Sequence, residues 1–182
     1  YTVPGSIYQY RSDMSNSWTN VLQRAVSGAL EGMSYGHATR IVCPTSLISD
    51  SINRQYKAHF DKTVVIPPGV DVSRYESLNR KRHGGRLLYV GNAKPHLGLE
   101  ILLKALKIVL ETTPNAHLVI VEGDTFARYK IDHWLEQMEL KDSVHVMGDI
   151  SDEELAEEYG EAEIMVVPAL AGGLGIRCLE AM

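Results

Sequence analysis

Apolar residues in the first third of the chain recur at three- and four-residue steps. The series that begins at Trp18 and ends at Met33 predicts an amphipathic helix behind a Ser/Asn-rich start. Short apolar runs at residues 41–44 and 64–66 predict two strands. Between these runs, a second helical stretch is expected to place three apolar residues on one side: Leu47, Ile48 and Ile52.

A polar segment at residues 68–85 separates this part from a regular alternation. The segment contains a basic run at residues 80–83 and shows no apolar periodicity. Beyond it, strands are predicted at 86–91, 117–121, 144–148 and 163–168, helices at 99–110, 126–138 and 152–160, and a last helix from near Gly175. Such alternation is typical of parallel strands with covering helices, so we predict a doubly wound α/β sheet. We predict a domain junction in the segment 68–85.

The composition of the chain is that of an ordinary globular protein without membrane-spanning helices. The chain has 182 residues, of which 45% are hydrophobic and 23% charged, as in ordinary globular domains. No apolar run approaches the roughly 18 to 20 residues of a membrane-spanning helix. Cys43 and Cys178 are far apart, which indicates two reduced thiols, and no leader pattern opens the chain. The sequence therefore predicts a cytoplasmic protein.

The charge is unevenly distributed along the chain. The formal net charge of −5 argues against nucleic acid as the main partner. Residues 1–99 contain 12 basic and 6 acidic residues, whereas residues 100–182 contain 6 basic and 17 acidic ones. Any contact with an anionic lipid surface is therefore expected through basic residues of the first part of the chain rather than through the acidic half.

Three strand-to-helix loops are expected at one edge of the second sheet, at residues 91–96, 122–125 and 169–175. In the last loop, glycines allow the backbone to approach a ligand closely, and the following helix start presents unpaired N–H groups. This combination suits a phosphate. A tight turn without any ligand explains the same glycines equally well.

Three charged side chains stand near these loops. The ammonium group of Lys94 could offset charge on a leaving phosphate, and Arg177 could offer a guanidinium to a diphosphate. The carboxylate of Glu180 could bind a sugar or ribose hydroxyl if the loop folds back. The alternative for each of these three residues is an ordinary solvated side chain at the surface, without a role in binding or catalysis.

The sequence shows no pattern for a metal site. Its seven histidines do not cluster at metal-ligand spacing, and no Asp-x-Asp pair is present. The acidic run at residues 152–158 is interpreted as the solvated face of a helix, without a catalytic role.

Several short motifs occur in an order that resembles a known family. They are IPPGVD at 66–71, LYVG at 88–91, LVIV at 118–121, VMGDIS at 146–151, and VP at 167–168 followed by LEAM at 179–182. Together they resemble retaining nucleotide-sugar glycosyltransferases of the GT-B type, in the family called glycosyl transferases group 1. The resemblance covers roughly residues 40–182.

The resemblance implies a fold of two Rossmann-like domains that face each other across a cleft. Residues 1–67 would be the end of the acceptor domain, 68–85 the interdomain linker, and 86–182 the first half of the donor domain, so the chain would be part of a longer protein. Family members transfer a sugar from a nucleotide-diphosphate donor to a hydroxyl acceptor with retention, without a metal or other cofactor. We expect polysaccharide or glycoconjugate biosynthesis, with a glycan or lipid-linked sugar as acceptor and, for a lipid, peripheral contact at the inner face of the membrane.

The resemblance also implies site residues. Lys94, Arg177 and Glu180 would be catalytic. The nucleotide sugar would lie against these residues: Gly91, Asn92, Glu122, Gly123, Ile150, Gly172, Gly173, Leu174 and Gly175.

The chain departs from the family pattern at three positions. Asn92 and Leu97 stand where the family usually places Arg and Lys on the diphosphate, and Gly172 stands where a Glu commonly binds the donor sugar. These departures motivate a rival reading, a non-catalytic nucleotide-sugar-binding or scaffold module. A GT-B nucleotide-sugar epimerase is a third reading with weaker motif support.

Overall fold

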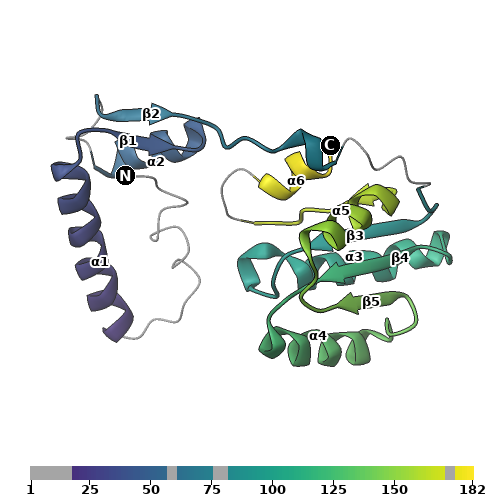
Figure 1. Ribbon diagram of the computed structural model, residues 1–182. Helices are drawn as coiled ribbons and strands as arrows, with labels where there is room; N and C mark the ends of the chain where they lie inside the picture. Colours follow the sequence, from purple (N-terminus) through teal and green to yellow (C-terminus); the bar gives the residue numbers. More distant parts are fainter. Residues whose placement is uncertain (1–17, 57–60, 76–81, 171–174) are drawn as a thin grey trace. The chain divides into compact units, whose positions relative to one another are not determined.

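The computed structural model describes residues 18–56, 61–75, 82–170 and 175–182 (Figure 1). The described residues form two compact units. The first unit ends at Gly69, and the second consists of Val70–Leu170 and Gly175–Met182. Among the described residues, no helix is both long enough and apolar enough to cross a membrane.

The first unit is a small α/β arrangement. Its elements are α1 (Trp18–His37), β1 (Ile41–Cys43), α2 (Ser46–Gln55) and β2 (Thr63–Val65). β1 and β2 pair in parallel, with Val42 opposite Val64. The hydroxyl of Thr45 accepts a hydrogen bond from the amide of Ile48 at 3.2 Å, which caps the start of α2.

The core of the first unit corrects one prediction about α2. Ile48 and Ile52 are buried with Tyr35 and Ile41, but the side chain of Leu47 is 78% exposed. Residues four apart share one face of a helix, whereas adjacent residues point about 100° apart. Leu47 therefore lies on a different side from the other two.

The second unit contains a four-stranded parallel sheet. Its strands are β3 (Arg86–Val90), β4 (His117–Val121), β5 (Val144–Met147) and β6 (Ile164–Met165), in the order β5-β4-β3-β6. All three strand pairs are parallel, which confirms the predicted α/β class. Figure 1 shows the arrows of β4 and β5 pointing the same way.

The strand β6 is much shorter than the predicted run at 163–168. The amide of Val166 still donates to the carbonyl of Leu88 at 2.8 Å, but the amide of Leu170 donates instead to the carbonyl of His96 at 2.9 Å. The chain thus leaves the sheet after Val166, and four residues later its backbone bonds to the loop after β3.

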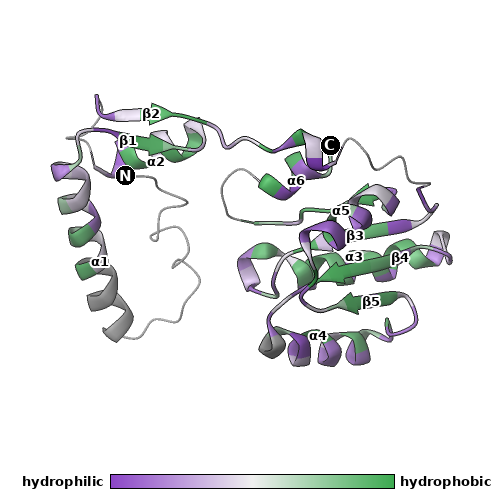
Figure 2. Cartoon of the chain, viewed as in Figure 1, coloured by the Kyte–Doolittle hydropathy of each residue, from purple (hydrophilic) through white to green (hydrophobic). Residues whose placement is uncertain are grey.

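Helices cover both faces of this sheet. α3 (Leu99–Thr112) and α4 (Thr125–Met138) pack on the face that carries Leu118 and Ile120, and α5 (Asp152–Glu161) packs on the opposite face. The short elements are η3 (Val72–Arg74), η4 (Pro95–Leu97) and α6 (Ile176–Glu180). Figure 2 shows β4 as largely hydrophobic and the outer side of α4 as hydrophilic. A sheet buried on both faces explains the nearly continuous apolar runs in the sequence.

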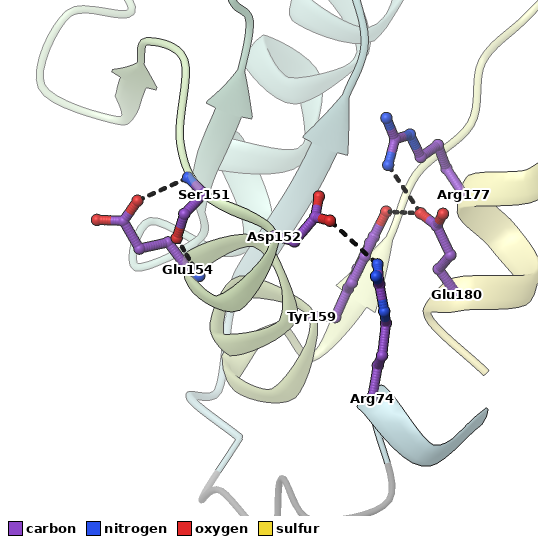
Figure 3. A network of polar contacts seen from close by, with 7 residues as sticks. All are labelled: Arg74, Ser151, Asp152, Glu154, Tyr159, Arg177 and Glu180. Atoms are coloured by element: carbon purple, nitrogen blue, oxygen red, sulfur yellow. Dashed lines mark hydrogen bonds and ion pairs between the residues drawn. The ribbon is translucent and has the colours of Figure 1, made fainter. Parts of the chain in front are cut away.

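The acidic helix α5 is only partly a solvated face. Ser151 and Glu154 form a capping box at its start, with bonds of 3.1 and 2.8 Å (Figure 3). Further along, Glu158 is half-buried and forms an ion pair with Arg86 of β3. The prediction of a wholly solvated acidic face is therefore wrong for Glu158, because the tertiary structure brings a basic residue from 72 positions away.

The segment expected to be a linker contributes residues to the second unit. Residues 70–75 include η3, and the ring of Tyr75 packs edge-on against Tyr159 of α5 with centroids 6.0 Å apart. Arg74 forms an ion pair of 3.0 Å with Asp152 at the start of the same helix (Figure 3). These contacts attach residues 74 and 75 of the segment to α5.

Candidate functional site

The strand order locates the site at one point of the second sheet. The chain builds β3, β4 and β5 in one direction and then returns to place β6 on the other side of β3. Such a reversal opens a crevice at the carboxyl ends of the two strands where the order changes, and open α/β sheets bind ligands there. In this chain those two strands are β3 and β6.

Two contacts join the loops that leave β3 and β6. The amide of Leu170 donates to the carbonyl of His96 at 2.9 Å. Gly98 has a φ of 74°, and a Cβ atom at this position would lie only 2.1 Å from the carbonyl oxygen of Pro168. The close approach of these backbones depends on glycine, because any side chain would collide with the neighbouring loop.

The loop after β3 is shaped by its own polar groups. Gly91 has a φ of 155°, and the hydroxyl of Tyr89 donates to the carbonyl of Asn92 at 2.9 Å. The side-chain oxygen of Asn92 accepts a hydrogen bond from the amide of Lys94 at 3.3 Å. The side chain of Lys94 is exposed at the start of η4. The loop thus holds Asn92 in a turn and leaves Lys94 exposed to solvent at the carboxyl edge of the sheet.

The loop after β4 contains a buried carboxyl group. Glu122 is 7% exposed, and its Oε1 accepts a hydrogen bond from the amide of Asp124 at 2.9 Å. Its Oε2 has no hydrogen-bond partner of good geometry among the described residues. Burial raises the pKa of Glu122 more than the amides of Asp124 and Ala93 and the charge of Lys94 lower it.

The surroundings of Glu122 are otherwise compact. Burial, with a smaller effect from the charge of Glu122, raises the pKa of the Tyr89 hydroxyl to about 12, so this phenol stays protonated. A Cβ atom added to Gly123 would lie 3.4 Å from Oδ1 of Asp149, in the loop after β5. In that loop, Ile150 is half-buried, and its side chain packs against the apolar cluster under α5.

The raised pKa of Glu122 predicts a pH-dependent stability. The unfolded chain releases this proton at the ordinary pH for glutamate, whereas the folded chain retains it to higher pH. The free energy of unfolding should therefore fall as the pH rises between these two pKa values. Urea unfolding over a pH series should show a smaller fall in Glu122→Gln than in the wild-type protein. The exposed control Glu111→Gln should follow the wild type, and an equal pH profile in both variants would contradict the assignment.

The helix α6 carries a network around Glu180 (Figure 3). Its Oε2 accepts hydrogen bonds from the hydroxyl of Tyr159 at 2.8 Å and from Nη1 of Arg177 at 2.9 Å. Partial burial alone would lower the pKa of Arg177, but the hydrogen bond and charge of Glu180 raise it. The guanidinium of Arg177 is thus directed partly to a carboxylate of its own helix.

The predicted site residues that the structure describes lie in two places, the loops at the carboxyl edge of the sheet and the helix α6. Lys94, Asn92, Glu122 and Gly123 lie in the loops at the carboxyl edge of the sheet, and Gly175 caps the start of α6 with an ordinary φ of −69°. Gly172, Gly173 and Leu174 lie outside the described residues.

Tyr159 was missed as a site residue by reasoning from sequence. Its pattern showed only an inward-facing residue of an acidic helix, and a hydroxyl that reaches α6 leaves no local signal in the sequence.

Among the described residues, no group of three or more His, Cys, Asp or Glu side chains is placed to hold a metal ion.

Comparison with known proteins shows the same architecture elsewhere. The chain is 27% identical over 161 residues to the O-antigen chain mannosyltransferase RfbU of Salmonella typhimurium, and this match covers 88% of the chain and 44% of RfbU. Among solved structures, WaaG, a glycosyltransferase involved in lipopolysaccharide biosynthesis, matches with a TM-score of 0.82 and 20% identity, over 100% of this chain and 53% of WaaG.

A third match has bound ligands. Anabaena HepE, solved in complex with UDP and glucose, matches with a TM-score of 0.71 and 17% identity, over 91% of this chain and 46% of HepE. These structural likenesses show the fold, a parallel α/β arrangement of the GT-B type. The chain spans about half the length, or less, of each of these three proteins.

The sequence profile of one protein family matches directly. The family described as "Glycosyl transferases group 1" matches residues 76–182, which is more than half of the chain and includes all four strands of the second sheet. The chain belongs to the glycosyl transferases group 1 family.

Proposed function

We propose that the protein containing this chain transfers a sugar from a nucleotide-diphosphate donor to a hydroxyl acceptor, with retention and without a metal ion. The observation that carries this proposal is the meeting of the loops after β3 and β6 at the point where the strand order reverses, in a chain of this family. In this proposal, residues 86–182 are donor-binding, residues 1–67 belong to the acceptor domain and residues 68–85 connect them.

The proposed donor site lies along the carboxyl edge of the sheet. Lys94 and Arg177, with the backbone amides of residues 172–175, would stabilise the negative charge on the leaving diphosphate. Glu180 would accept hydrogen bonds from ribose or sugar hydroxyls. The remaining contacts would come from the loops that contain these residues: Gly91, Asn92, Glu122, Gly123 and Ile150.

The chemistry proposed for this site is mainly electrostatic. As the bond between the anomeric carbon and the diphosphate breaks, the acceptor oxygen bonds to that carbon from the same face, and the leaving diphosphate, which gains charge, takes the proton of the acceptor hydroxyl. Cations and backbone amides that are already in position stabilise this charge without reorganising. Lys94 fits this role, because its exposed side chain lies at the carboxyl edge of the sheet and its backbone amide is bound by the side chain of Asn92.

The relatives indicate the class of substrate. RfbU is named as a mannosyltransferase of O-antigen chains, WaaG acts in lipopolysaccharide biosynthesis, and HepE was solved with UDP and glucose. We therefore propose a role in polysaccharide or glycoconjugate biosynthesis, with a glycan or lipid-linked acceptor. For this chemistry we propose a cytoplasmic enzyme that contacts the inner face of the membrane peripherally, through basic residues of the acceptor domain rather than through the acidic second half of the chain.

An assay of the full-length protein tests the proposal against its rivals. The protein is incubated with UDP-, GDP- and ADP-sugars and a set of glycan and lipid-linked acceptors, and the products are separated. Free nucleotide together with a new glycoside of unchanged anomeric configuration is expected. Donor binding without turnover would favour a scaffold module, and an isomerised nucleotide sugar would favour an epimerase.

The substitution Lys94→Ala should affect turnover more than donor binding. A charge that matters chiefly when the diphosphate departs contributes to the transition state and little to the ground state. We expect kcat to fall by about tenfold or more, and the donor Kd to change by less than about threefold. Steady-state kinetics and calorimetry measure the two quantities, with Lys107→Ala on the exposed side of α3 as control. An increase in Kd with unchanged kcat would contradict this role.

A further inference from the structure

The two carboxylate oxygens of Glu180 have different surroundings. Oε2 accepts two hydrogen bonds, from the hydroxyl of Tyr159 at 2.8 Å and from Nη1 of Arg177 at 2.9 Å. Oε1 has no hydrogen-bond partner among the described residues, although the side chain is only 15% exposed. Figure 3 shows Tyr159 and Arg177 converging on the same end of the carboxylate. The protein thus holds Glu180 by one oxygen and leaves the other available.

The residue that donates from α5 is itself firmly placed. Tyr159 is 8% exposed and packs in the apolar cluster with Leu88 and Leu155. The ring of Tyr75 lies edge-on against it, with centroids 6.0 Å apart and an angle of 71° between the planes. A hydroxyl on so fixed a ring has few alternative positions. Burial, together with the hydrogen bond to Glu180, also raises the pKa of this phenol, so the hydroxyl keeps its proton and can donate.

We propose that Tyr159 is a positioning residue for donor binding: it fixes the carboxylate of Glu180 so that Oε1 can accept hydrogen bonds from hydroxyl groups of the nucleotide sugar. An ionised carboxylate only accepts hydrogen bonds, and two adjacent hydroxyls of a ribose or hexose are matching donors. This inference rests on the proposed function, because it requires Glu180 to contact the donor.

The physical advantage of this arrangement is preorganisation. A glutamate side chain at the surface of a short helix samples several rotamers. When a ligand binds only one of them, the lost conformational entropy of the side chain reduces the binding free energy. The hydroxyl of Tyr159 orders the carboxylate before the ligand arrives. Arg177 alone is a weaker anchor because its own side chain is about half exposed.

The test is a double-mutant cycle on the full-length protein. Calorimetry measures the Kd of whichever of UDP, GDP or ADP binds the wild-type protein. Tyr159→Phe removes only the hydroxyl, and we expect the Kd to rise by about tenfold, as for other hydrogen bonds to a charged group. Tyr129→Phe, which removes a hydroxyl from a largely exposed residue of α4, should leave the Kd unchanged. In a Glu180→Ala background, Tyr159→Phe should have no further effect.

A rescue experiment separates positioning from packing. Incorporation of 4-aminophenylalanine at position 159 keeps the ring and a hydrogen-bond donor, so it should restore most of the affinity. Incorporation of 4-fluorophenylalanine fills the volume of the hydroxyl without donating, so it should behave like Phe. The fluorinated variant also replaces the Phe variant if the latter does not fold, as judged by thermal unfolding.

The outcomes distinguish failure of this inference from failure of the proposed function. If Glu180→Ala alone leaves the Kd unchanged, the proposed donor site is wrong. If Glu180→Ala weakens binding but Tyr159→Phe does not, Tyr159 does not position Glu180. An equal loss from Tyr159→Phe in both backgrounds would assign Tyr159 a purely structural role and would also overturn the inference.

Discussion

Replacing Gly98 with alanine is expected to lower the free energy of unfolding by about 3 kcal/mol, the largest effect on stability that we predict for a single methyl group here. The φ of 74° at this position is unfavourable for a residue with a Cβ atom, and the added Cβ would lie 2.1 Å from the carbonyl oxygen of Pro168. Because that oxygen belongs to backbone, the clash cannot be relieved by turning a side chain. The loops after β3 and β6 must instead separate.

This separation should also weaken donor binding, since the proposed site lies between these two loops. Chemical denaturation measures the stability, and calorimetry with the preferred nucleotide measures the Kd. The matched control is Gly148→Ala in the loop after β5, where an added Cβ atom meets nothing within 4 Å. Equal destabilisation by the two substitutions would show that the contact between Gly98 and Pro168 does not constrain the loops.

Replacing Glu180 with alanine should lower kcat/KM for the donor by about a hundredfold. If Oε1 accepts hydrogen bonds from two hydroxyls of the donor, the substitution removes two bonds to a charged group, and each contributes about 1.5 kcal/mol or more. It also leaves the buried hydroxyl of Tyr159 without an acceptor and Arg177 without its partner. Steady-state kinetics at varied donor concentration measures the loss.

A control separates this effect from a general loss of negative charge. Glu153→Ala removes an exposed carboxylate from α5, the helix that carries Tyr159, and should leave kcat/KM within about twofold of the wild type. Thermal unfolding of each variant shows whether the protein remains folded at the assay temperature. Near-normal kinetics in a folded Glu180→Ala variant would place the donor hydroxyls elsewhere.

Hydrophobic periodicity predicted most elements of the second unit close to their observed bounds. α3 and β4 are examples, because each buries a regular set of apolar residues that recurs at the period of its own backbone. The prediction was less accurate where the backbone finds partners outside the sheet. β6 is short, and Leu170 bonds to the loop at His96 instead of extending the sheet; no property of the run 163–168 indicates that contact.

For the charged side chains too, the sequence identified the candidates but did not indicate their surroundings. The motif at the end of the chain identified Glu180 as a candidate site residue, and the loop after β4 identified Glu122. The sequence did not indicate that Glu122 would be buried or that Tyr159 would donate to Glu180 from 21 positions away. The burial of a residue and its distant hydrogen-bond partners depend on which elements pack against it. Residues adjacent in the sequence therefore do not indicate them.

By itself, the sequence determined the α/β class, the alternation of strands and helices in the second unit, and the family, since these depend on local periodicity and on motifs that run along the chain. Only the tertiary structure decided the strand order β5-β4-β3-β6, which reverses between β3 and β6. It also decided the contact between Gly98 and Pro168 and the hydrogen bond from Tyr159 to Glu180. These features join residues far apart in the chain, and they form only when the helices on both faces of the sheet have packed.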